Sequence, residues 1–115
     1  CGVFPSRGEG WNLELLELMA VGKHVIATNY SAHTEFCNKE NCSLIEIDEK
    51  EPAFDGKWFF GQGNWAKIDD KAIESLEHSM ETFISEKRGT LNEIGIQTAK
   101  DFSWQNTANE ILNVL

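Results

Sequence analysis

One stretch decides the fold, and it reads Pro5-Ser6-Arg7-Gly8-Glu9-Gly10-Trp11-Asn12-Leu13-Glu14-Leu15-Leu16-Glu17. The apolar run over residues 1–5 predicts a buried strand. Apolar residues at helical spacing predict a deeply packed helix over residues 12–21, with Asn12 as a candidate N-cap and Gly22 at the stop position. A loop with two glycines therefore leads from a strand directly into a helix. The first amides of such a helix lack intrahelical partners and carry partial positive charge, which makes the loop a candidate phosphate site.

The segments that follow continue the alternation of strand and helix. A second buried strand is expected over residues 24–28, one or two helical turns over 31–36, and a third strand over 43–47. This order implies parallel pairing with right-handed crossovers. We therefore expect an α/β fold: the second half of a Rossmann-like, doubly wound parallel sheet, with C-terminal helices, in one partial domain over residues 1–115.

Residues 51–66 interrupt this alternation, because five aromatic side chains stand there among three glycines and one proline, and the pattern predicts a loop or hairpin. Trp58 and Trp65 offer flat faces on which a sugar can stack; alternatively, they cover the sheet edge or pack on the last helices. Helices are then expected from Asp69 or Asp70 to about Lys87, from Thr90 (in capping-box spacing with Glu93) to about Lys100, and after Ser103, with an apolar stripe of Trp104, Ala108, Ile111 and Leu115.

Composition narrows the class of protein. With 115 residues, 41% of them hydrophobic and 25% charged, the chain is expected to form a single globular domain. A formal net charge of −9 repels phosphates at long range, so a nucleic-acid partner is not expected. No apolar run approaches the roughly 20 residues of a membrane span, and the first residues do not resemble a signal peptide. An odd number of cysteines, three, favours a reducing compartment, and we expect a cytoplasmic protein.

His33, Cys37 and Cys42 raise the alternative of a metal site, because three soft ligands lie within ten residues. Familiar zinc sites use closer cysteine pairs and a fourth ligand, which is not evident here. We therefore expect buried thiols near a helix end and no metal.

Glu9 and Glu17 flank the predicted helix start. A carboxylate there can accept hydrogen bonds from sugar hydroxyls, and one further along the helix can reach a ribose. The alternative is that Glu9 only favours the positive helix end and that Glu17 is solvated. A glycoside hydrolase with these two acids as its catalytic pair is disfavoured, because Glu17 lies within the helix and does not face Glu9 across a cleft.

The same stretch resembles the E-x7-E motif region of GT-B glycosyltransferases, especially glycosyltransferase family 4, in which the run is P-S-x-x-E-G-F-G-x-x-x-L-E-A-M-A-x-G-x-P-V-I-A. Glu9 and Glu17 have the required spacing of seven residues. Glu35 matches the acid after the next strand of that family, and Asp101-Phe102-Ser103-Trp104 resembles the F-S-W that opens its last helix. The departures are Asn12 for Gly, His24 for Pro and Leu18 for Ala.

The resemblance implies a role for each matching residue. Glu9 corresponds to the catalytic-site carboxylate that contacts hydroxyls of the donor sugar, as an orienting group. Glu17 corresponds to the residue that binds the nucleotide ribose. The donor sugar and its diphosphate are expected along the backbone of the loop and helix start, at Gly8, Gly10, Trp11, Asn12 and Leu13.

The resemblance also implies a reaction. A glycosyl group, of hexosyltransferase type, moves from a nucleotide diphosphate sugar to an acceptor, with retention at the anomeric carbon and with no metal or other cofactor. The acceptor domain is expected outside this chain, as part of the full-length parent. The 115-residue chain alone is expected to be inactive, and either to associate through the free edge of the strand over residues 1–5 or to be marginally stable. The alternative is a non-catalytic nucleotide- or sugar-binding module, or an inactive fragment.

Overall fold

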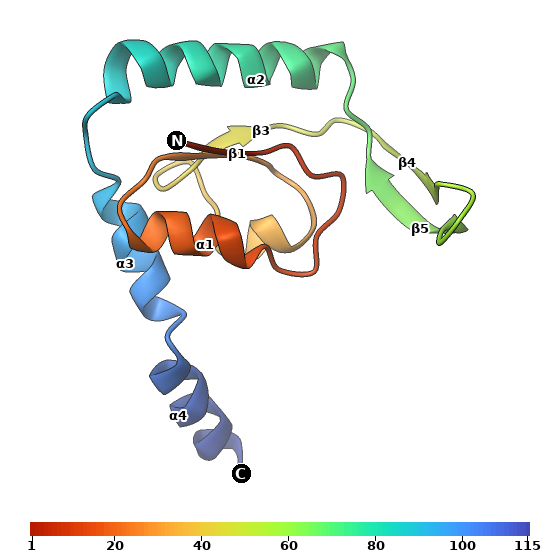
Figure 1. Ribbon diagram of the computed structural model, residues 1–115. Helices are drawn as coiled ribbons and strands as arrows, with labels where there is room; N and C mark the ends of the chain where they lie inside the picture. Colours follow the sequence, from red (N-terminus) through yellow and green to blue (C-terminus); the bar gives the residue numbers. More distant parts are fainter.

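A three-stranded parallel sheet forms the centre of the protein in a computed structural model that describes residues 1–115 (Figure 1). Its strands are β1 (Gly2–Phe4), β2 (Val25–Thr28) and β3 (Ser43–Ile45), in the order β1-β2-β3. Helix α1 (Leu13–Ala20) connects β1 to β2, and a 3₁₀ turn, η1 (Ser31–Glu35), lies between β2 and β3. The expected α/β alternation is therefore confirmed. Association through the β1 edge stays a prediction.

Helices cover both faces of this sheet. The four residues of β2 are accordingly all buried, and its three apolar residues alternate between two hydrophobic clusters. Val25 and Ala27 belong to a cluster with α1, whereas Ile26 packs with β3 and with Ala72 of α2 (Asp70–Thr82). In Figure 1, α2 and α1 accordingly lie on opposite sides of the strands. Helices on both faces of a parallel sheet are consistent with a Rossmann-like fragment.

Helix α1 carries the candidate site on its first turn, and both of its ends have defined caps. The Asn12 side chain accepts from the Leu15 amide. At the other end, Gly22 has φ 73°, and Lys23 N–H donates to the Leu18 carbonyl at 2.9 Å, as in a Schellman motif. Leu15 and Met19 are fully buried. The expectation of a deeply packed helix is wrong at two positions, since Leu13 and Ala20 are exposed.

The aromatic segment forms an antiparallel hairpin of β4 (Lys50–Phe54) and β5 (Phe60–Ala66), which confirms the hairpin alternative. The hairpin projects from the body of the protein (Figure 1), yet its base is fixed. Ala66 N–H donates to the Arg7 carbonyl at 2.8 Å, and the Tyr30 hydroxyl donates to the Asn64 carbonyl at 2.9 Å. Trp58, near the tip, is 72% exposed.

The expected capping box at Thr90 is wrong. Helix α2 ends in a π-helical turn, η2 (Phe83–Lys87), and α3 (Glu93–Asp101) has Asn92 as its N-cap, two residues later than the predicted cap at Thr90. Asn92 is buried; its Oδ1 accepts from Gly95 N–H, and its Nδ2 donates to the Asn41 carbonyl at 2.8 Å. Asn92 therefore caps the helix and holds it to the segment before β3, whereas the Thr90 hydroxyl donates to the Lys87 carbonyl and lies 2.9 Å from His24 Nε2.

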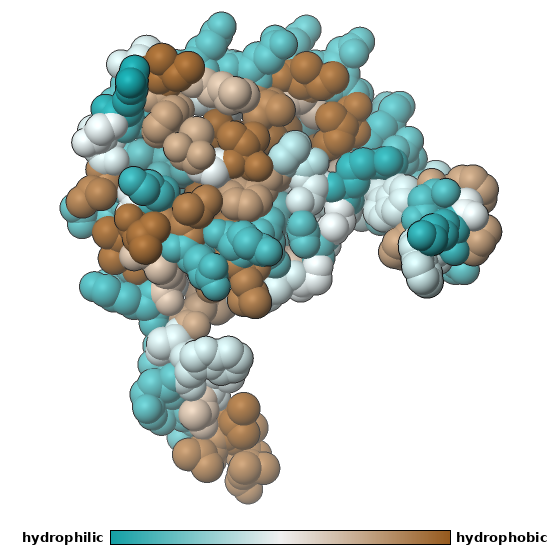
Figure 2. All heavy atoms as spheres, in the orientation of Figure 1, coloured by the Kyte–Doolittle hydropathy of each residue, from teal (hydrophilic) through white to brown (hydrophobic).

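The last helix, α4 (Trp104–Val114), is capped by Ser103 as predicted, but its apolar stripe is not buried. Trp104 is 89% exposed, and Figure 2 shows hydrophobic side chains on the projecting end of α4. The hairpin and α4 both extend outward. The radius of gyration is consequently 15.8 Å, against about 13 Å for a compact domain of this length.

Cys37 and Cys42 are buried beside α1, as the thiol interpretation predicts. The neighbouring Cys37 thiol, followed by burial, raises the pKa of Cys42 above its ordinary value. No helix in the structure has the length and apolar character that a membrane span requires.

Candidate functional site

The loop between β1 and α1 lies at the carboxyl edge of the sheet and is fastened to the segment that follows β2. The Thr28 hydroxyl donates to the Ser6 carbonyl at 2.7 Å. The Ser31 hydroxyl donates to the Glu9 carbonyl at 2.7 Å and accepts from the Glu9 amide at 3.2 Å. Each such bond contributes about 0.5–1.5 kcal/mol, so the loop conformation is held by several side chains at once. In an open parallel sheet this edge is where ligands bind.

The backbone amides at the helix start are open. Leu15 N–H donates to Asn12 Oδ1 and Leu16 N–H to the Asn12 carbonyl, so the cap satisfies these two donors. Four backbone N–H groups before this point donate to no acceptor in the protein. They are those of Gly10, Trp11 and Asn12 in the loop and of Leu13, the first residue of the helix. These are the amides at which the family resemblance leads us to expect the donor sugar and its diphosphate. Unpaired N–H groups at a helix N-terminus attract anions through their orientation and the helix dipole.

Asn12 has a left-handed backbone, φ 75° and ψ 72°, a conformation that favours glycine, and glycine is the residue at this position of the motif that the sequence resembles. Asn is among the few other residues that tolerate this conformation. Its side chain is 8% exposed and points into the protein, where Nδ2 lies 2.9 Å from His33 Nε2. The substitution therefore does not place side-chain atoms in front of the open amides.

Glu9 is half-buried, and its orientation is set by the loop itself. The Ser6 hydroxyl donates to Glu9 Oε1 at 2.8 Å, which leaves Oε2 without a protein donor. Arg7, the basic residue of the loop, is turned away from this carboxylate. Its guanidinium pairs with Glu51 and stacks on the Trp65 ring, 4.6 Å from the ring centre. Arg7 thus anchors the hairpin, and the open amides are the positive feature of the helix start.

Glu17 lines a groove of about 550 Å³ between α1 and α4. Trp11 and Leu13 line the same groove, so the structure brings the helix start and the second acid together. Phe102 and Trp104 add aromatic surface, and Trp11 packs on Phe102 with ring centres 5.4 Å apart. Gly8, Glu9 and Gly10 do not line this groove. The structure therefore assembles Trp11, Leu13 and Glu17 around one hollow and leaves Glu9 on the adjoining loop.

The sequence did not assign Thr28, Ser31 or His33 to this site, and it raised His33 only as a possible metal ligand. Thr28 ends β2, Ser31 and His33 follow it, and their bonds to Ser6, Glu9 and Asn12 cross from one strand end to the next. The available signal was the run of polar residues after a buried strand, because the carboxyl ends of neighbouring parallel strands meet at one edge. His33 is fully buried between Asn12 and Thr28, and no group of side chains in the structure is arranged to hold a metal ion.

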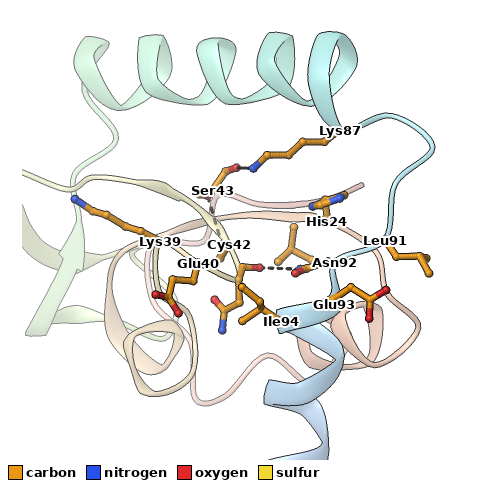
Figure 3. A pocket seen from close by; sticks show the side chains of 12 residues that line it. His24, Lys39, Glu40, Cys42, Ser43, Lys87, Leu91, Asn92, Glu93 and Ile94 are labelled. Atoms are coloured by element: carbon orange, nitrogen blue, oxygen red, sulfur yellow. Dashed lines mark hydrogen bonds between the residues drawn. The ribbon is translucent and has the colours of Figure 1, made fainter.

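A second cavity, of about 260 Å³, lies at the opposite edge of the sheet, between the starts of β2 and β3 and the start of α3 (Figure 3). Lys87, His24 and Ser43 are among its lining residues, and Lys87 Nζ lies 3.5 Å from Ser43 Oγ. Ligands of open parallel sheets bind beyond the carboxyl ends of the strands. We therefore place the candidate site at the loop before α1 and not in this cavity.

We expect His24, which lines this second cavity, to make the stability of the fold depend on pH. Burial, and then the Lys87 ammonium, lower the pKa of His24 below its ordinary value. As the pH falls through about 6.5, the unfolded chain takes up this proton before the folded one, so the contribution is present above that pH and lost below it. We expect the unfolding free energy to fall more between pH 7.5 and 5.5 in the unchanged protein than in His24→Gln, measured by urea titration. Equal losses in the two proteins would contradict this assignment.

Comparison with known proteins gives one match. Residues 1–55, just under half of the chain, match the family model described as Glycosyl transferases group 1. The matched segment contains the whole sheet, the loop at its carboxyl edge and α1. No curated protein and no solved structure matches the chain.

Proposed function

Because the match of residues 1–55 supports a GT-B glycosyltransferase, we propose that this chain forms part of the donor-binding domain of such an enzyme, over residues 1–115. The donor is a nucleotide diphosphate sugar, and the acceptor is bound outside this chain. The similarity to glycosyltransferase family 4 extends the proposal to transfer of a hexosyl group with retention and without a resident metal. The observation that carries the proposal is the row of open amides at the start of α1, beside Glu9.

In this proposal the amides of Gly10 to Leu13 bind the diphosphate. During transfer, the anomeric carbon exchanges its bond to a diphosphate oxygen for a bond to the acceptor oxygen, and the proton of the acceptor hydroxyl passes to the diphosphate or to water. Negative charge therefore grows on the departing diphosphate as its bond to carbon breaks. Fixed N–H donors aimed at that charge stabilise the transition state without having to reorient. A net charge of −9 does not favour anions, which makes such local donors all the more necessary.

Glu9 and Glu17 divide the recognition of hydroxyl groups in this proposal. Oε2 of Glu9 is open to accept from the donor sugar, because Ser6 occupies the other oxygen. Glu17 accepts from the ribose in the groove that it shares with Trp11 and Leu13. Ionised carboxylates accept stronger hydrogen bonds than neutral groups, and a sugar or ribose offers adjacent hydroxyls that suit them.

The test is a binding panel on the full protein that carries this chain, by calorimetry. Uridine, guanosine and adenosine diphosphates and their glucose or mannose conjugates are compared with the same nucleosides without phosphate. We expect at least one nucleoside diphosphate to bind at least ten times more tightly than its nucleoside, and the corresponding sugar conjugate to be turned over. Equal affinity with and without the diphosphate, or no binding by any member, contradicts the proposal. Binding without turnover favours the non-catalytic module.

A further inference from the structure

The Asn12 carboxamide makes two contacts that require opposite ends of the group. Oδ1 accepts from Leu15 N–H at 3.2 Å, which caps α1. Nδ2 lies 2.9 Å from Nε2 of His33. The side chain is therefore fixed in one of its two amide orientations, and the left-handed backbone of Asn12 is fixed with it, since the carboxamide reaches both partners from that conformation.

His33 determines which orientation of Asn12 is stable. Its Nδ1 lies 3.0 Å from the Thr28 carbonyl oxygen, which can only accept, so Nδ1 carries the proton. In the neutral imidazole Nε2 is then an acceptor and receives Nδ2–H of Asn12. If the carboxamide were flipped, its Oδ1 would face the Nε2 lone pair and its Nδ2 would face Leu15 N–H, and both contacts would be lost.

The Thr28 carbonyl is the last link of this chain of bonds, and it belongs to the carboxyl end of β2. The connection therefore runs from the central strand through His33 and Asn12 to the first turn of α1. All three side chains are buried, with Thr28 and His33 at 0% exposure, so water does not compete for these bonds. This series of hydrogen bonds reaches α1 at the turn that carries the open amides of Trp11, Asn12 and Leu13.

We propose that Asn12 and His33 form a positioning pair that sets the direction of the open amides at the start of α1. The pair touches no ligand; it acts through the backbone of Asn12. The inference rests on the proposed function, because the amides matter only if they bind a diphosphate. A glycine at position 12 can adopt the left-handed conformation because it has no Cβ. Asn12 adopts the same conformation and in addition connects α1, through His33, to the end of β2.

The experiment uses the full protein with inorganic pyrophosphate as the probe. We expect His33→Leu to weaken pyrophosphate binding by about 3- to 10-fold, the effect of losing one hydrogen bond that orients the site. His33→Gln rescues most of this loss, because its amide can donate to the Thr28 carbonyl and accept from Asn12. Asn12→Gly is also expected to weaken pyrophosphate binding less in the His33→Leu variant than in the unchanged protein, because the two residues act as one unit.

A second measurement keeps the two proposals apart. Nitrogen-15 NMR of labelled histidine reports the tautomer of His33 in the unchanged protein, with the proton expected on Nδ1. A proton on Nε2 overturns the pair whatever the protein binds. Pyrophosphate affinity unchanged in His33→Leu overturns the positioning role alone, even if the variant is less stable. If the unchanged protein does not bind pyrophosphate, both the proposed function and the positioning role are overturned. The tautomer of His33 then still decides whether the hydrogen-bonded pair exists.

Discussion

Glu9→Gln is expected to lower kcat/KM for glycosyl transfer by about 10- to 100-fold. Gln keeps an oxygen for the Ser6 hydroxyl but loses the charge that strengthens hydrogen bonds from the donor sugar. Hydrogen bonds to charged groups contribute about 1.5–3 kcal/mol, and about 1.4 kcal/mol corresponds to a factor of 10 in rate. The measurement is steady-state kinetics of the full protein with the donor that the binding panel identifies.

Glu14→Gln is the matched control for this prediction. Glu14 carries the same carboxylate in the first turn of α1, but it is exposed and has no partner among the site residues. Its loss costs about 0.3–1 kcal/mol of helix-dipole stabilisation and leaves kcat/KM within a factor of about two. If both variants lose activity equally, the effect belongs to the charge of the helix start in general, and Glu9 has no special role.

Leu15→Ala is expected to destabilise the fold by about 2–5 kcal/mol. Leu15 is fully buried in the cluster that joins α1 to Val25 and Ala27 of β2. Its truncation removes apolar contacts and leaves a cavity under the helix that carries the site. A domain of this size has a total stability of about 5–15 kcal/mol, so the loss is a large fraction of it. Urea unfolding followed by circular dichroism measures the change.

Leu13→Ala on the same helix is the comparison for stability. Leu13 is 60% exposed, and we expect its truncation to change the unfolding free energy by no more than about 0.5 kcal/mol. A similar loss in both variants would mean that α1 does not pack on the sheet through the face that contains Leu15 and Met19.

The sequence predicted the parts of the fold that depend on local signals. The strand, glycine loop and helix over residues 1–21, the stop at Gly22 and the caps at Asp69 and Ser103 follow from spacing and from the conformational preferences of single residues. The open amides are a consequence of the same local pattern. Glu9 and Glu17 could also be identified from the sequence, because the spacing of seven residues between them is visible there.

The errors arise where tertiary contacts decide between local alternatives. Thr90 and Asn92 both offer a cap, and the choice of Asn92 depends on the Asn41 carbonyl, which is 51 residues away in the sequence. The apolar residues of α4 predict burial, but no residue of this helix is buried in the structure. The link from His33 to Asn12 joins residues 21 apart, and periodicity contains no information about which polar groups meet across a strand end.

The clamp between Arg7 and β5 has a mechanical consequence. Arg7 exchanges backbone and side-chain bonds with Ala66 and stacks on Trp65, and only Gly8 separates it from Glu9. The base of the projecting hairpin is thus attached to the loop two residues before Glu9. We expect a displacement of the hairpin tip at Trp58 to shift the bend before α1, and with it the carboxylate of Glu9.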